Sequence, residues 1–315
     1  MKIAIGAPTY NDHERIERLF QSILTLTDFP EEDYELVMID DGTKSQVHIE
    51  GLNNLSKALN ISLILNKENR GIPYCWNRLT EYYDAEYVIL FNDDIQIKNR
   101  NWLKYFIYFM ENNPHAGNIG FPLLHIDSMG NINEKCDPPN EDVPPGRVGA
   151  PVGCAFGFRK ELWKKVKNPD GSVGFYEDLI SFYEEISFGF EISKMGYYCH
   201  MLPTPSMEHW GSQTFSNNPE LAVRKISAAI PKEEYLQIMA MTQKPSLPYK
   251  EHRDLAAKGL AYRMDYSRVL FAKLWNCMDK WDLPQLETHR SIIDKMEPKL
   301  TKWLDKNGNA KEASV

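Results

Sequence analysis

Short apolar runs alternate with amphipathic segments over the first hundred residues of the chain. Four of these runs are rich in β-branched and aliphatic residues and predict buried strands over 3–6, 35–39, 61–65 and 88–91. The segments between them predict helices, from apolar spacing over about 16–24 and 72–83 and from polar composition over about 45–59. Strands that alternate with helices in this way form a mostly parallel sheet with right-handed crossovers. We therefore expect an α/β fold.

Two of the expected helices carry local signals of their own. Asn11, with Glu14 three residues later, predicts a capping box at the start of the first helix. Around 182–195, apolar residues recur at i and i+4 and predict the buried side of a helix: Phe182, Ile186 and Phe190. That helix is expected to end at Gly196, a C′ glycine.

The regular alternation stops near Gly120. A Pro-, Gly- and charge-rich loop over about 137–146 is longer than a simple connection requires, and both a lid and a plain surface excursion fit it. A strand over 152–158, a short helix over 160–166 and a last strand over 198–202 follow.

The remainder of the chain changes character beyond Thr214. Residues 255–278 and 286–304 carry scattered apolar stripes with mixed charge and predict a helical extension over 215–315. The stripes suit packing against the preceding domain, acceptor binding and homo-oligomer formation alike. The tail over 307–315 is expected to be disordered. Residues 1–214 are expected to form one α/β domain with two halves, about 1–98 and about 99–214.

Composition narrows the class of protein. The 315 residues are 43% hydrophobic and 25% charged, as in ordinary globular proteins, and the net charge of −8 disfavours broad, nonspecific binding to nucleic acid or anionic lipid. No apolar run is long enough to span a bilayer, and the first residues suit a strand rather than a signal peptide. The five widely spaced cysteines contain no Cys-x-x-Cys pair, so they suggest neither a disulfide framework nor a zinc site. We expect a cytoplasmic protein.

Three predicted strands run into polar signatures: Pro8-Thr9-Tyr10-Asn11, Asp40-Asp41-Gly42 and Asn92-Asp93-Asp94. The carboxyl ends of parallel strands meet at one edge, where open α/β sheets bind ligands. Two adjacent carboxylates are costly to bury unless a cation lies beside them. A hard divalent ion such as Mg²⁺ or Mn²⁺ takes oxygen ligands and often bridges to phosphates. Taken alone, Asp93-Asp94 fits an exposed acidic turn equally well.

These signatures, with two later ones, form an ordered series that resembles the family 2 glycosyltransferases over about residues 1–212. The further members of the series are Asn69-Arg70-Gly71 with Asn77, the stretch Phe175 to Tyr197 that contains Glu184-Glu185, and Glu208-His209-Trp210-Gly211-Ser212. The resemblance implies a GT-A fold, Rossmann-like, with a mostly parallel central sheet flanked by helices. It also implies that 1–98 is the nucleotide-sugar half of the catalytic domain and 99–214 the acceptor half.

The resemblance assigns a donor site and a metal site. It implies that Asp40 accepts a hydrogen bond from a uracil ring and that Thr9 lies beside the base and ribose. The remaining residues expected to bind the nucleotide sugar are Pro8, Asn11, Asn69, Gly71, Asn77, Asn92 and Asp93. Asp94 would be the direct ligand of Mn²⁺ or Mg²⁺, Asp93 would contact the sugar or the water shell of the ion, and His209 would be a further metal ligand or a diphosphate contact.

The same resemblance implies the catalytic base and the acceptor side. The aspartate that serves as the base in the family falls on Glu185, one methylene longer, and Glu184 could share the role. In-line attack with such a base inverts the anomeric centre. Gly153 and Cys154, after the Pro-rich loop, are expected to border the acceptor, and Trp210 is the best candidate to line a sugar.

Each motif has a simpler interpretation when it is isolated. His209 would be structural, Glu184-Glu185 would complement a helix dipole, Asp40-Asp41-Gly42 would be an ordinary turn, and Thr9 would cap a helix. Their common order favours a metal-dependent enzyme that moves a sugar from a UDP-sugar to a hydroxyl of a glycan or other acceptor.

Three alternatives stay open at this point. A nucleotidyltransferase would want a Gly-rich basic turn after the first strand, and Ala7-Pro8-Thr9-Tyr10 offers none. A non-catalytic nucleotide- or sugar-binding module of the same fold would bind a donor without turnover. A nucleic-acid acceptor is disfavoured by the acidic balance of the chain.

Overall fold

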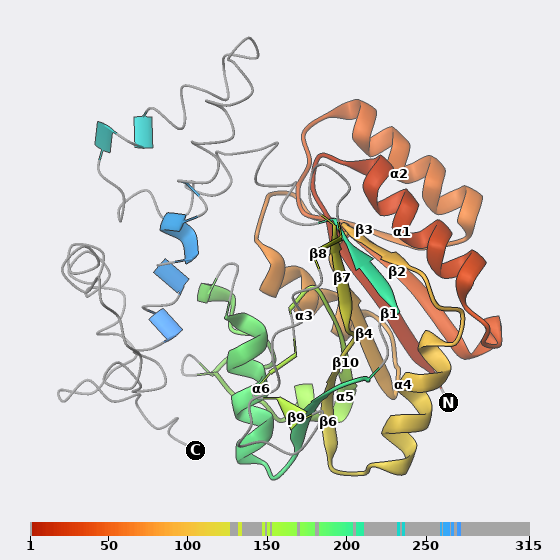
Figure 1. The fold of residues 1–315 in the computed structure, drawn as a ribbon. Coiled ribbons are helices and arrows are strands. Elements are labelled where there is room, and N and C mark those ends of the chain that lie inside the picture. The colour runs from red at the N-terminus through yellow and green to blue at the C-terminus, as the bar shows by residue number, and fades with distance from the viewer. Residues whose placement is uncertain are drawn as a thin grey trace. The chain divides into compact units, whose positions relative to one another are not determined.

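The computed structural model describes residues 2–126, 132–133, 147–148, 150–151, 153–168, 171–179, 183–203 and 206–210, with short stretches between 232 and 271 (Figure 1). The chain divides into two compact units, of which the first comprises Met1–Lys167, Val173–Glu177 and Glu184–Gly211. The second comprises Asn168–Ser172, Asp178–Tyr183 and Ser212–Val315. The loop expected over 137–146, the helix expected over 286–304 and the tail lie outside the described residues, as does most of 255–278.

Strands and helices alternate along the first unit. The strands are β1 (Ile3–Thr9), β2 (Tyr34–Asp40), β3 (Ser62–Leu65), β4 (Tyr87–Phe91), β5 (Ile95–Ile97), β6 (Ala116–Gly120), β7 (Leu123–Ile126), β8 (Ile132–Asn133), β9 (Arg147–Val148), β10 (Ala155–Arg159), β11 (Tyr198–Met201) and β12 (Met207–His209). The helices are α1 (His13–Leu26), α2 (Gln46–Leu59), α3 (Ile72–Tyr82), α4 (Trp102–Asn112), α5 (Lys160–Trp163) and α6 (Glu184–Lys194).

The central sheet has eight strands in the order β3-β2-β1-β4-β10-β6-β11-β9. Strands β3, β2, β1 and β4 are parallel, and so are β6 and β11, which confirms the expected mostly parallel α/β sheet. Strand β10 runs antiparallel to β4, with Ala155 opposite Phe91, so the residues before β10 lie at the carboxyl end of β4. A second sheet, in the order β5-β12-β7-β8, continues from that same end.

Helices flank the central sheet (Figure 1), and an apolar core lies on each of its two faces. Successive residues of β4 alternate between them, because side chains in a strand point to opposite faces. Ile89 and Phe91 pack with α1, α2 and α4, whereas Val88 and Leu90 pack with α3, α5 and α6. Burial on both faces explains why the sequence of this strand is continuously apolar.

Four local predictions need correction. The cap of α1 is Asp12, whose Oδ1 accepts from the backbone N–H of Arg15 at 3.0 Å, because Asn11 adopts φ of 55°. Strand β10 begins at Ala155 rather than at 152, and β11 is not the last strand, because β12 follows it. The buried side of α6 is formed by Phe188 and Ile192, while Ile186 and Phe190 are only half-buried; Phe182 lies outside the described residues.

Candidate active site

The carboxylate of Asp40 closes the turn after β2. Its Oδ2 accepts from the backbone N–H groups of Gly42 and Thr43 at 3.1 and 2.9 Å. Its Oδ1 is buried and has no hydrogen-bond partner among the described residues. Burial raises the pKa of Asp40 above its ordinary value, against the lowering effect of the hydrogen bonds from Thr43 and Gly42. One oxygen therefore builds the turn and the other is left for a donor from outside the described chain.

Asp41 joins that turn to the loop before α3. Its Oδ1 accepts from the N–H of Arg70 at 2.8 Å and from Asn66 Nδ2 at 3.1 Å, and its Oδ2 accepts from the N–H of Gly71 at 2.8 Å. Gly42, at φ of 82°, packs so closely on this loop that a Cβ there would lie 2.2 Å from the carbonyl carbon of Glu68. Sequence reasoning missed Asp41, since only the fold brings its partners to it.

The expected donor residues of this loop have different surroundings. Asn69 and Gly71 are half-buried at the loop, and Gly71, at φ of 97°, precedes the first turn of α3. Asn77 is buried in α3, and each of its two polar side-chain atoms makes two hydrogen bonds. Its Oδ1 accepts from Trp163 Nε1 and from the N–H of Phe175, and its Nδ2 donates to the carbonyl of Phe175 and to Glu177 Oε1. These four bonds exhaust an amide side chain, so Asn77 positions the chain around Phe175 rather than offering a free group to a nucleotide.

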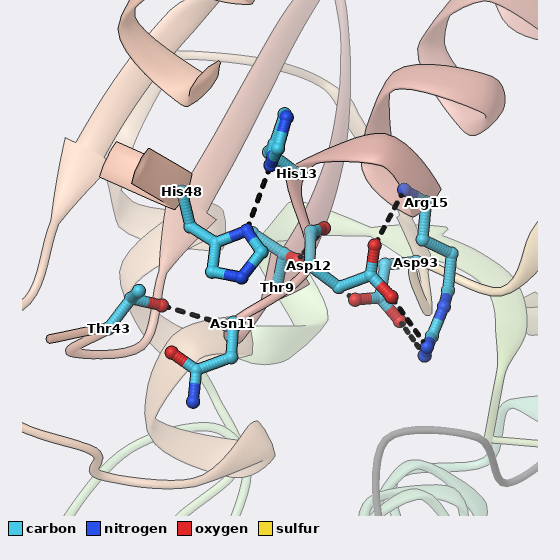
Figure 2. Close-up of polar contacts among 8 residues, drawn as sticks. All are labelled: Thr9, Asn11, Asp12, His13, Arg15, Thr43, His48 and Asp93. Atoms are coloured by element: carbon cyan, nitrogen blue, oxygen red, sulfur yellow. Dashed lines mark hydrogen bonds and ion pairs between the residues drawn. The ribbon is translucent and has the colours of Figure 1, made fainter. Parts of the chain in front are cut away.

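Asp93 is held by residues from β1 and α1 (Figure 2). Thr9 Oγ1 donates to Asp93 Oδ2 at 2.9 Å, and Arg15 Nη1 lies 3.7 Å from Asp93 Oδ1. Arg15 Nη2 also lies 2.7 Å from Asp12 Oδ2. Burial raises the pKa of Asp93 to about 7, although the positive charge of Arg15 acts in the opposite direction. The cation required beside the carboxylate pair is supplied, for Asp93, by Arg15, which sequence reasoning did not identify.

Two contacts join the starts of α1 and α2 beside this network (Figure 2). The backbone N–H of Asn11 donates to Thr43 Oγ1 at 2.9 Å, and His13 Nδ1 lies 2.9 Å from His48 Nδ1. Pro8 is buried within β1. Thr9 lies opposite Asp40 in the register of β1 and β2, so the turns after β1, β2 and β4 form one edge.

Asp94 lies against β12. His209 Nε2 is 3.4 Å from Asp94 Oδ2, and the N–H of Trp210 donates to the carbonyl of Asp94 at 2.9 Å. Asp94 Oδ1 is buried and has no partner among the described residues. The part of the chain that the structure describes contains no group of three or more His, Cys, Asp and Glu side chains that could together hold a metal ion. An unpartnered carboxylate oxygen beside an imidazole nitrogen nevertheless fits two protein ligands of an ion whose remaining ligands come from water or a phosphate. Trp210 is 39% exposed.

Glu185 lies in the first turn of α6 and points its carboxyl group at Gly153. A Cβ on Gly153 would lie 2.7 Å from Glu185 Cδ. Glu185 as a residue is half-buried, but its Oε2 is enclosed and has no partner among the described residues. Burial raises the pKa of Glu185 to about 7, against the lowering effect of the N–H groups at the start of the helix. Glu184, its neighbour, is buried.

The turn at Gly153-Cys154 lies near both Asp94 and Glu185. Cys154 is buried, and burial together with the negative charges of Asp94 and Glu185 raises its thiol pKa well above the ordinary value. The carbonyl of Cys154 accepts from the N–H of Asn92 at 2.9 Å, while Asn92 Oδ1 is buried without a partner among the described residues. Asp94 and Glu185, far apart in sequence, therefore share one short turn. A carboxylate suited to a cation and a carboxylate able to take a proton near neutrality therefore both lie near this turn.

A family model and a curated relative match part of the chain. The model described as glycosyl transferase family 2 matches residues 4–166, more than half of the chain. The poly(ribitol-phosphate) beta-glucosyltransferase of Bacillus spizizenii is 31% identical over 115 residues, which are 36% of this chain and 18% of that protein. The chain thus spans only a small part of that relative.

Solved structures share the fold at low sequence identity. The crystal structure of S. aureus TarS matches with a TM-score of 0.55 at 19% identity, and the match covers 98% of this chain and 50% of the TarS chain. Residues 1–349 of TarS in complex with UDP-GlcNAc give a TM-score of 0.54 at 19% identity, with coverages of 94% and 81%. The mannosyltransferase PcManGT from Pyrobaculum calidifontis, in complex with GDP-Man and Mn²⁺, gives 0.52 at 16% identity, with coverages of 96% and 87%. These likenesses confirm the expected GT-A fold.

Proposed function

The chain belongs to glycosyl transferase family 2, and from that premise we propose that it transfers a sugar from a UDP-sugar to an acceptor hydroxyl. The reaction would depend on Mn²⁺ or Mg²⁺ and would invert the anomeric centre. The observation that carries the proposal is that the Gly153-Cys154 turn connects the surroundings of Asp94 and Glu185: the Glu185 carboxyl group rests against Gly153, and the carbonyl of Cys154 accepts from the N–H of Asn92, two residues before Asp94. In a metal-dependent glycosyl transfer, one carboxylate can hold the ion that activates the donor and a second can remove the proton of the acceptor.

The donor nucleotide would bind along the edge formed by β1, β2 and β4. Asp40 Oδ1, buried without a partner in the described part of the chain, can accept from the ring N–H of uracil. Thr9 and Pro8 line the end of β1, and the loop with Asn69 and Gly71 borders the same edge through Asp41. The backbone of that loop is fixed before any ligand arrives, which reduces the entropy lost on binding.

Asp94 and His209 would hold the divalent ion. When bound, such an ion neutralises the charge that grows on a departing diphosphate. Asp94 presents for this purpose an oxygen that has no partner among the described residues. Asp93 would mainly hold Thr9 and Arg15 in place beside the donor, since these two residues already occupy its two oxygens.

Glu185 would accept the proton of the attacking hydroxyl. A base with a pKa of about 7 is largely ionised at slightly alkaline pH and still basic enough to take a proton. Glu184 precedes it in the same helical turn, and a comparison of the two glutamine variants would decide which of the carboxylates is the base. Gly153, Cys154 and Trp210 would border the acceptor, with the indole of Trp210 available to cover a sugar face.

The names of the relatives guide the choice of substrates. UDP-glucose and UDP-GlcNAc are the first donors to test, because one relative is a glucosyltransferase and the TarS structure contains UDP-GlcNAc. GDP-mannose serves as the contrasting donor. Poly(ribitol-phosphate) and simpler polyol phosphates are the first acceptors, and glycans and oligonucleotides extend the panel.

The test is the release of nucleoside diphosphate from this donor panel with Mn²⁺, Mg²⁺ or EDTA, with and without acceptor. Wild type would be compared with Asp94→Ala, Glu184→Gln and Glu185→Gln. Ion-dependent release from one donor, abolished in Asp94→Ala, would support the proposal, and NMR of the product would report inversion or retention.

A silent panel would be followed by thermal unfolding with each nucleotide. Stabilisation by UDP and Mn²⁺ without turnover on any acceptor would favour a binding module over an enzyme. Absence of any stabilisation by nucleotides would refute the proposal.

A further inference from the structure

The backbone conformation of Gly153 does not explain why this position is a glycine. Its φ lies outside the left-handed region, unlike those of Gly42 and Gly71, so its backbone is open to other residues. What excludes a side chain is the carboxyl group of Glu185: a Cβ at 153 would lie 2.7 Å from Cδ, 2.9 Å from Oε1 and 3.0 Å from Oε2. The carboxyl group thus rests with all three of its atoms against the bare backbone.

We propose that Gly153 is a positioning residue for Glu185, matched to the length of a glutamate side chain. This inference rests on the proposed role of Glu185 as the base. Removal of one methylene from Glu185 would draw the carboxylate back from residue 153 and make the glycine unnecessary. Gly153 and Glu185 therefore form one functional unit.

The turn that supports Glu185 is itself fixed to the metal side of the site. The carbonyl of Cys154 accepts from the N–H of Asn92, and the next residue, Ala155, pairs with Phe91 across β10 and β4. Asp94 follows two residues after Asn92. Backbone contacts therefore link the turn on which the Glu185 carboxyl group rests to the end of β4, just before Asp94.

The size of the expected effect follows from the contact distances. Carbon atoms in ordinary contact lie about 3.5–4.0 Å apart, so a methyl group at 153 would push the carboxyl group away by about 1 Å. The displaced atoms are the free end of a long side chain, which makes the stability cost small. A misplacement of about 1 Å at a reacting group can cost about 10²-fold in rate.

A double-mutant cycle tests the match between the two residues. We expect Gly153→Ala to lower kcat for nucleoside diphosphate release with acceptor by about 10²-fold, with the donor KM within about 3-fold of wild type. Glu185→Asp lowers kcat by a comparable factor, because its carboxylate recedes. In the Glu185→Asp background, Gly153→Ala should cost less than about 3-fold, a coupling that independent sites do not show.

Two results would overturn the inference while leaving the proposed function intact. One is a Gly153→Ala enzyme with wild-type kcat. The other is an equal loss from Gly153→Ala in both backgrounds, which would indicate a structural role of the turn unrelated to the length of residue 185.

Crystal structures of wild type and Gly153→Ala supply a readout that needs no turnover. A Glu185 carboxyl group displaced by about 1 Å supports the contact, and one that stays in place refutes it. If wild type showed no turnover with any donor, the proposed function would fail, and this structural comparison would still decide whether Gly153 positions Glu185.

Discussion

The carboxylates at this edge of the sheet fall into two groups. Asp41 and Asp93 have both oxygens occupied by N–H groups, a hydroxyl or Arg15. Asp40, Asp94 and Glu185 each keep a buried oxygen with no partner among the described residues. A buried polar atom without a partner costs about 1–3 kcal/mol.

The difference distinguishes residues that build the site from residues that serve a ligand. An occupied carboxylate contributes stability and shapes a loop, so its loss should weaken folding. An unoccupied buried oxygen lowers stability until something outside the chain pairs with it, so its loss should remove activity at no cost in stability. The variants below test whether the two groups separate in this way.

The largest expected effect is that of Asp94→Asn on activity. The amide keeps the shape of the side chain but is a much weaker ligand for a hard cation, so we expect about a 10³-fold loss of ion-dependent nucleoside diphosphate release. The melting temperature should stay the same or rise in the absence of ion. A melting temperature lowered by several degrees, with activity retained, would place Asp94 among the residues that build the site.

Arg15→Met should have the next largest effect, on stability. Arg15 is buried and its guanidinium faces Asp93 and Asp12, so its removal leaves a buried carboxylate without its cation. Breaking a buried ion pair from one side costs about 3 kcal/mol or more, which is over 100-fold in the folding equilibrium. Urea unfolding measures this cost.

Asp93→Asn in the Arg15→Met background is the matched control. Neutralising the second partner should recover a substantial part of the lost stability, because no unpaired charge then remains at position 93. Equal instability of the single and double variants would show that Arg15 stabilises α1 by packing alone.

The sequence predicted the strands and the chemistry at their ends better than it predicted the partners of those residues. Apolar runs such as 88–91 are informative because a strand buried on both faces needs them. Arg15 was missed because its partner Asp93 is far away in the sequence. The spacing of residues in α1 does not show that the Arg15 side chain reaches Asp93.

Asp41 and strands β5 and β12 were missed for related reasons. Two of the three partners of Asp41 are backbone N–H groups of a loop about 30 residues further along the chain, and backbone donors leave no signature in a sequence. Strands of three residues are too short to display a period. The positions of His209 and Trp210 beside Asp94 depend on β12. Because β12 was not predicted, the expected roles of these two residues came from the family resemblance and not from the hydrophobic pattern.

Asp41→Asn is the smaller test of the occupied group. The amide can present only one oxygen to the three donors that now converge on the carboxylate, so at least one N–H of Arg70 or Gly71 loses its acceptor. We expect a loss of about 2 kcal/mol in urea unfolding. The ion dependence of the folded variant should match that of wild type, and an altered ion dependence would mean that Asp41 serves the ligand after all.

A further expected effect is a pH dependence of stability centred on Glu185. Its pKa is raised by burial from 4.5 to about 7, so the folded state keeps a proton that the unfolded state releases between these values. The stabilisation is fully present below pH 4.5 and is lost as the pH rises through about 7. Wild type should therefore lose stability over this interval relative to Glu185→Gln, which has no proton to release.

Activity should change in the opposite direction over the same interval. A base must be ionised to act, so kcat should rise about tenfold between pH 6 and its plateau above pH 7. Asp93 has a pKa of about 7 as well, but it is present in both proteins, so the difference in unfolding free energy between wild type and Glu185→Gln reports Glu185 alone. A difference that does not vary with pH would mean that Glu185 is ionised throughout, and the enclosed carboxyl group would then need a cation beside it, as Asp93 has in Arg15.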